Sequence, residues 1–130
     1  MRKAFVIAIT LLITGVTHAQ TEEWLWARNA GGISADYGRS IAVDGSGNSY
    51  VTGYFAGTAI FGSTSLTSSG GEDIYIAKLD ANANFLWAKK AGGTNGDKGL
   101  SIAVDGSGNS YVTGYFQDTA TFGSTSLTSS

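Results

Sequence analysis

The 130-residue sequence contains no cysteine and no proline, and its one histidine is His18. His18 falls in the N-terminal segment that we expect to be removed on export. The remaining chain therefore cannot build a Ser-His-Asp triad, a thiolate nucleophile, a structural zinc site or a His-ligated metal centre. Disulfides are excluded too, so packing and sheet hydrogen bonds must supply the stability. We expect no catalytic residue, no metal and no cofactor.

Charge is also sparse, since Asp, Glu, Lys and Arg make up 14% of the sequence. Without residues 1–19, six basic side chains face ten acidic ones, a net charge of −4. Proteins that bind nucleic acid present a basic face to the phosphates. We therefore predict no nucleic-acid partner.

The N-terminus has the three parts of a secretory signal peptide. Residues 1–3 are Met-Arg-Lys, residues 4–16 form an apolar run, and residues 17–19 are Thr-His-Ala, with a small residue at the cleavage position. A membrane anchor is the alternative, but the run is shorter than the roughly 20 residues that cross a bilayer. We predict that residues 1–19 are a signal peptide, and that residues 20–130 are secreted or lie at the cell surface with no membrane segment.

An internal repeat organises the rest of the chain. Residues 40–69 return as residues 101–130, a shift of 61 positions, with three differences. Self-similarity at such a period is typical of solenoids and propellers, whose units become stable by stacking on their neighbours.

The repeat unit is predicted to be all-β. Short segments rich in β-branched and aromatic residues occur at 39–44, 48–55, 73–80 and 84–90, bounded by clusters of Gly, Asn, Asp and Ser. Residues 44–48, Asp-Gly-Ser-Gly-Asn, favour a tight hairpin, and residues 56–71 leave room for a further small hairpin. Four antiparallel strands per unit is the number found in a propeller blade.

These elements resemble a known family. Residues 44–54, 70–79, 86–88 and 92–93 are similar to the SBBP repeat, the seven-bladed β-propeller repeat of secreted bacterial proteins. The resemblance extends over nearly all of residues 24–130. It implies a propeller within a large exported and often surface-associated protein, in a family without agreed catalytic residues.

The number of blades differs from that of a closed propeller. Residues 24–29 match the outer strand at 85–90, residues 39–90 make one blade, and residues 100–130 supply half of another. Propellers close with 4 to 8 blades, so about one and a half blades form an incomplete ring. We expect residues 20–130 to be a partial propeller region of a longer protein. Closure of the ring by a homo-oligomer is the alternative.

Differences between the two repeats indicate where a ligand would bind. They fall just before the first strand and just after the second, which meet at one end of an up-and-down sheet. Binding residues commonly lie on loops of a rigid scaffold, although drift in exposed loops would give the same pattern. The candidate ligand-binding residues are Tyr37, Lys98, Gln117 and Asp118.

Other polar and aromatic residues have structural interpretations. Asp44, Ser46 and Asn48 alternate like the first ligands of a calcium loop, but Ser49 and Phe55 stand where that loop needs Gly and Glu. Turn chemistry is therefore the preferred role for this segment, and also for the recurring Asp36 and Asp97. Glu72 and Asp73 are neighbours on a strand and should point to opposite faces. The recurring Trp26 and Trp87 are predicted to pack between blades.

Two classes of function stay open at this stage. The preferred one is a non-enzymatic scaffold or binding module for a protein or a polysaccharide. The alternative is part of an exported propeller enzyme, a polysaccharide lyase or glycosidase, whose catalytic residues lie outside this segment. The small apolar inner strand at 40–43 offers no paired carboxylates for such chemistry.

Overall fold

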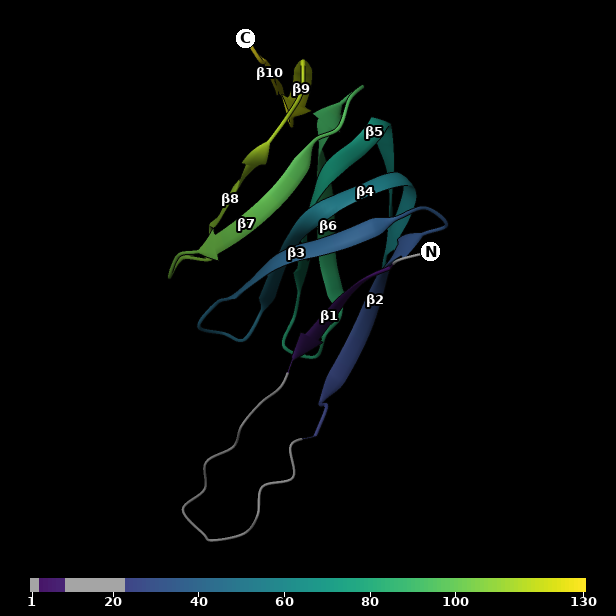
Figure 1. Ribbon diagram of the computed structural model, residues 1–130. Helices are drawn as coiled ribbons and strands as arrows, with labels where there is room; N and C mark the ends of the chain where they lie inside the picture. The colour runs from purple at the N-terminus through teal and green to yellow at the C-terminus, as the bar shows by residue number, and fades with distance from the viewer. Residues whose placement is uncertain (1–2, 9–22) are drawn as a thin grey trace, which may run out of the picture.

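The computed structural model describes residues 3–8 and 23–130, which form strands and turns (Figure 1). The all-β prediction is confirmed for this part of the chain. The strands are β1 (Ala4–Ala8), β2 (Trp26–Gly32), β3 (Asp36–Val43), β4 (Ser49–Phe61), β5 (Thr64–Leu79), β6 (Phe85–Gly93), β7 (Lys98–Val104), β8 (Ser110–Tyr115), β9 (Thr119–Phe122) and β10 (Thr125–Thr128).

Strands β3 to β6 form one complete antiparallel blade. β3 pairs with β4, β4 with β5 and β5 with β6, so the four predicted strands are confirmed, each longer than expected at one end and one residue shorter at the other. The small hairpin expected within residues 56–71 is also present. It is the continuation of β4 and β5 to a turn between Phe61 and Thr64, which pair with each other.

The second repeat supplies a half-blade. β7 pairs with β8 as β3 pairs with β4, and β9 and β10 form the equivalent of the small hairpin. Among the described residues β8 has no strand on its other edge, where the complete blade has β5. The prediction of about one and a half blades is confirmed.

The joint between units is built the same way twice. Gly92 and Gly93 at the end of β6 pair with Thr121 and Ala120 of β9. Gly31 and Gly32 at the end of β2 pair with Ile60 and Ala59 of β4, which are the same positions 61 residues earlier. The end of each outer strand therefore pairs with the small hairpin of the next unit.

The core lies between the complete blade and the β1–β2 pair. The Tyr75 ring is 4.8 Å from the Phe61 ring and 6.5 Å from the Phe55 ring, and all three side chains are buried. Gly53 is required beneath Tyr75, because a Cβ there would lie 1.8 Å from the Tyr37 carbonyl oxygen and 2.9 Å from the Tyr75 ring. On the opposite side of the core, the β1–β2 pair contributes the buried side chains of Val6 and Ala30.

Of the two recurring tryptophans, Trp26 packs against the core between the units as predicted, whereas Trp87 contacts a residue of its own blade, and neither is fully buried. Trp26 packs against the core from β2. Trp87 is half-buried and meets the edge of the Tyr50 ring at 6.3 Å.

The N-terminal segment contains a strand. β1 pairs antiparallel with β2, from Ala4 opposite Ala30 to Ala8 opposite Trp26. The cleavage site predicted at residues 17–19 lies outside the described residues. Within residues 3–8 and 23–130, no helix is long and apolar enough to span a membrane.

Candidate functional site: the variable end of the blades

The positions that differ between the repeats meet at one end of the sheets, which we call the variable end (positions 33–35 and 56–57 in the first repeat, 94–96 and 117–118 in the second). The Asn95 side-chain amide donates a hydrogen bond to the Asp118 carboxylate. At the equivalent place in the first repeat, Ser34 Oγ lies 3.2 Å from where a Cβ on Gly57 would be. The predicted meeting of these two loops is therefore confirmed in both repeats.

The invariant hairpins lie at the opposite end of the first strands. Asp44 Oδ1 accepts hydrogen bonds from the backbone N–H groups of Ser46 and Asn48, and Oδ2 accepts from the Asn48 side-chain amide at 2.9 Å. These bonds, the Asn48 amide first, hold the pKa of Asp44 below its ordinary value. Asp105 and Asp80 repeat the arrangement. The turn interpretation of Asp44 is confirmed.

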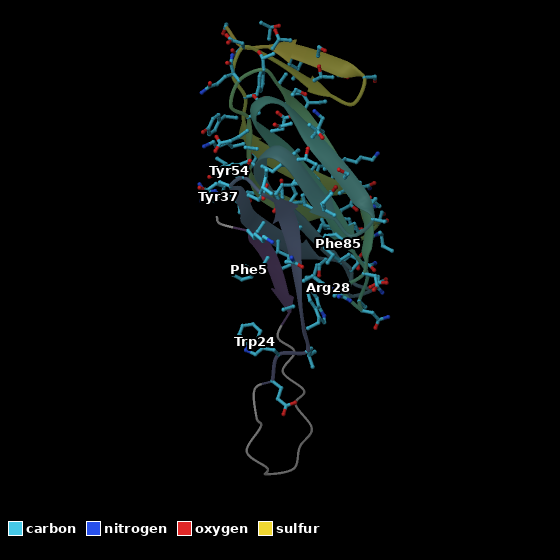
Figure 2. The ribbon with its side chains drawn as sticks, turned by 90° about the vertical axis from the view of Figure 1, so that its right-hand side faces the viewer. Phe5, Trp24, Arg28, Tyr37, Tyr54 and Phe85 are labelled. Atoms are coloured by element: carbon cyan, nitrogen blue, oxygen red, sulfur yellow. The ribbon has the colours of Figure 1, made fainter. Side chains whose placement is uncertain are left out.

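Tyr37 and Lys98 do not lie in loops, contrary to the sequence prediction. They belong to β3 and β7, because strand pairing begins earlier than the apolar pattern indicates. The Tyr37 ring stacks on the Tyr54 ring with centroids 4.7 Å apart (Figure 2). The Lys98 ammonium group lies 4.4 Å from the centre of the same ring. Both half-buried side chains thus pack on Tyr54 and stabilise the scaffold.

Lys98 also links the second repeat to the complete blade. Its Nζ is 2.9 Å from the Glu72 carboxylate on β5, and this hydrogen bond raises the pKa of Lys98. Sequence comparison missed Tyr54 because it is the same in both repeats, as Tyr115. Comparing the two repeats could identify Tyr37 and Lys98, which differ, but not the invariant Tyr54 on which they pack.

Gln117 and Asp118 are exposed at the variable end. Their backbones are hydrogen-bonded within the fold, and the Asp118 carboxylate also accepts the hydrogen bond from Asn95. The Gln117 N–H donates to Asp97 Oδ1 at 3.0 Å, and the Asp118 carbonyl accepts from the Ser129 N–H at 2.7 Å. Asp118 has a φ of 55° where the first repeat has Gly57 with a φ of 68°. The second repeat therefore places an acidic side chain at a position that favours glycine.

The buried aspartates have structural partners. Asp36 and Asp97 accept hydrogen bonds from the N–H groups of Gly32 and Gly93, at 2.8 and 2.7 Å, which confirms their predicted turn role. Burial raises the pKa of Asp36, whose Oδ1 has no hydrogen-bond partner. Asp73 is buried and pairs with Lys90 at 3.0 Å.

Glu72 and Asp73 diverge as the strand geometry predicts. Glu72 reaches Lys98 on the next repeat, whereas Asp73 is bonded within its own blade. The two neighbouring carboxylates therefore do not form a pair.

The exposed chemistry of the variable end changes from one repeat to the next. Ile33, Ser34, Ala56 and Gly57 give the first repeat an apolar and small surface. Thr94, Asn95, Gln117 and Asp118 give the second repeat a polar and acidic one. The strands that carry these loops are otherwise nearly identical in sequence.

A family model described as the β-propeller repeat, SBBP, matches residues 25–54 and 86–115. Both stretches belong to the β-propeller repeat family. Each matched β-propeller repeat runs from an outer strand, β2 or β6, into the first two strands of the following unit. The family unit thus spans the joint between blades.

A curated relative is similar to the same part of the chain. The uncharacterized WD repeat-containing protein L264 of Acanthamoeba polyphaga mimivirus is 34% identical over 114 residues, which is 74% of this chain. The chain spans 8% of the length of that relative.

Proposed function

We propose that this β-propeller repeat protein is an exported, non-enzymatic binding module that contacts a protein or a polysaccharide through its variable end. The observation that carries the proposal is the gathering of the differing positions at one end of otherwise repeated blades. Asn95 and Asp118, from two different loops of the second repeat, meet there through a side-chain hydrogen bond.

The scaffold beneath these loops is rigid. Lys98 and Tyr37 pack on Tyr54, and backbone hydrogen bonds from Gly71 and Asp97 to Thr94 and Glu72 fix the loop before β7. Loops held by a rigid scaffold are favourable places for recognition, because little conformational entropy is lost on binding.

The exposed groups indicate the kind of ligand. Thr94, Gln117 and Asp118 offer hydroxyl, amide and carboxylate groups, which suit the hydroxyls of a sugar chain or the polar groups of a protein surface. The WD repeats named in the viral relative are likewise four-stranded propeller blades. Export follows from the predicted signal peptide and stands as part of the proposal.

The test exchanges the variable end of one repeat for that of the other. The double variant Gln117→Ala/Asp118→Gly carries the residues of the first repeat, Ala56 and Gly57, so the fold already tolerates them. Immobilised protein is exposed to a panel of purified polysaccharides and extracellular proteins, and binding curves are recorded. We expect the double variant to bind the captured ligand about tenfold more weakly or worse, the effect of losing one or two polar contacts.

The matched control is Ser107→Ala, an exposed change in the hairpin at the opposite end. It should bind like the unmodified protein. Unchanged binding by the double variant, together with loss of binding by Ser107→Ala, would place the ligand at the wrong end for this proposal.

A further inference from the structure

A groove of about 470 Å³ lies at the joint between β2 and the complete blade. β2 contributes one wall, and the other comes from the end of β4, the turn after it and the hairpin between β5 and β6. Its volume is typical of pockets that hold small ligands. The side chains that give the groove its chemistry are Arg28, Asn29, Ile60, Asn84 and Phe85. They all lie within residues 28–85, so the groove involves neither the predicted signal peptide nor the half-blade.

β2 is held on the blade by contacts that do not involve β1. Gly31 and Gly32 at its end pair with β4, and Trp26 packs against the core. In addition, Arg28 Nε donates a hydrogen bond to the Ala83 carbonyl at 3.0 Å. The groove is therefore formed by the part of the chain that follows the predicted cleavage position.

The bond to Ala83 orients the Arg28 guanidinium group. Ala83 is fully buried, and its backbone N–H donates to the Asp80 carbonyl at 3.0 Å, so the acceptor is fixed by the hairpin. One of the five guanidinium N–H donors is used in this way. Within residues 3–8 and 23–130, no carboxylate forms an ion pair with Arg28. The outer nitrogens of the group form a fork that matches the two oxygens of a carboxylate.

Asp80, on the hairpin beside the groove, is occupied by its own turn. Its Oδ1 accepts from the backbone N–H groups of Asn82 and Asn84, and its Oδ2 accepts from the Asn84 side-chain amide at 2.9 Å. These bonds, those from Asn84 first, lower the pKa of Asp80, and the charge of Arg28 adds to the effect. Since Asp80 holds the amide nitrogen of Asn84, the amide oxygen is left to accept a hydrogen bond from a ligand.

Phe85 and Ile60 give the groove an apolar part. Phe85 is half-buried, with its ring centroid 6.0 Å from that of Phe61 in an edge-on contact, and it also lines the groove. Figure 2 shows Phe85 and Arg28 on the right-hand side of the view, away from Tyr37 and Tyr54 on the left. A ligand that packs on Phe85 can therefore reach Arg28 with an anionic group.

We propose that this groove binds an acidic sugar residue of a polysaccharide, with the sugar carboxylate on the fork of Arg28. The C–H groups of the sugar ring pack on Phe85, as apolar groups do on aromatic surfaces. The sugar hydroxyls bond to Asn29 and Asn84, whose amides both donate and accept. The groove is a second site, separate from the variable end, and the inference does not depend on binding there.

An acidic peptide fits the groove less well. Peptides that bind along a sheet use the free backbone groups of an edge strand. Gly31, the residue of β2 that lines the groove beside Asn29, is already paired with Ile60. Peptide side chains that anchor a complex also fill desolvated pockets, whereas the exposed Arg28, Asn29 and Asn84 make this groove polar.

The first test replaces Arg28 with Lys, the residue that the next outer strand carries at the equivalent position, Lys89. Lysine keeps the charge but loses the fork. Oligomers of galacturonate, glucuronate and mannuronate are titrated into the full chain in a calorimeter. We expect at least one of these oligouronates to bind the unmodified chain and to bind Arg28→Lys about tenfold more weakly. The matched control Arg39→Lys changes an exposed arginine outside the groove and should bind like the unmodified chain.

The second test observes Arg28 directly and does not depend on the stability of a variant. The Nε–H signal of Arg28 in an NMR spectrum is identified by its absence from Arg28→Lys. It should shift when the bound oligouronate is added, whereas the Arg39 signal should not. Methyl esters of the same oligomers keep the hydroxyls but lose the charge, and they should leave the Arg28 signal in place.

The inference is overturned if no oligouronate binds, if Arg28→Lys binds as tightly as the unmodified chain, or if the methyl esters bind equally well. An equal shift of the Arg28 signal with oligoglutamate would also overturn it and indicate an acidic peptide. The double variant Gln117→Ala/Asp118→Gly should bind the oligouronate normally. Loss of that binding would place the sugar at the variable end, against this inference and in favour of the proposed function.

Discussion

The ammonium group of Lys98 lies 4.4 Å from the centre of the Tyr54 ring, so the first strand of the second repeat is held directly on the complete blade. The Glu72 carboxylate, 2.9 Å from the same ammonium nitrogen, completes the contact.

Replacing Lys98 with Met should weaken this joint. Methionine keeps most of the apolar stem but loses the cation–π contact and the ion pair, which at a half-exposed site are together worth about 1 kcal/mol. Urea unfolding should show that loss, and Lys98→Arg should recover most of it. A Lys98→Met protein as stable as the parent would show that the stem alone holds the joint.

Replacing Tyr37 with Ala should cost at least about 0.5–1.5 kcal/mol, which is the range for an aromatic pair before its buried area is counted. The stack on Tyr54, with ring centroids 4.7 Å apart, is the reason. An exposed loop residue would give no measurable change, which is the outcome the sequence alone would predict. Tyr37→Phe keeps the ring and serves as the control in the same thermal unfolding experiment.

Gly57 and Asp118 occupy equivalent positions with a left-handed backbone conformation. Exchanging the two residue types should change the free energy of unfolding in opposite directions. Asp118→Gly removes the strain of a non-glycine residue at a φ of 55° and should raise the free energy of unfolding by up to about 1 kcal/mol. The loss of the hydrogen bond from Asn95 reduces this gain. Gly57→Asp should lower it by a similar amount. Denaturant midpoints measure both, and equal signs for the two changes would contradict the backbone explanation.

The Asp44 hairpin should make the free energy of unfolding depend on pH in the acidic range. Hydrogen bonds, the Asn48 amide first, lower the pKa of Asp44 in the folded state below 3.8. The ionised carboxylate therefore stabilises the fold above that ordinary value, and the contribution is lost as the pH falls through the lower folded pKa. Asp44→Asn should flatten the dependence of the melting temperature on pH below about 5. An unchanged pH profile would mean that the turn bonds do not need the charge.

Tyr75 should be the most sensitive position of the core. Its ring is buried among Phe55 and Phe61, so Tyr75→Ala should cost about 3–5 kcal/mol. Tyr75→Phe keeps the ring in place over Gly53 and should cost less than about 1.5 kcal/mol. Calorimetric unfolding distinguishes the two, and a small effect of Tyr75→Ala would show that the ring is not central to the packing.

The sequence by itself determined the strands, the hairpins and the repeat. Alternating apolar residues separated by Asp-Gly and Asn-containing turns are local signals, and a shift of 61 residues is visible without coordinates. The turn role of Asp44 could also be predicted, because its hydrogen bonds reach only to residues within the same hairpin.

Only the tertiary structure decided which residues meet across strands and repeats. Tyr37 and Lys98 were visible as differences, but their shared partner Tyr54 was not, because it is invariant and the contacts cross the sheet and the joint between repeats. The pairing of β1 with β2 was equally hidden, because it joins segments that are far apart in the chain.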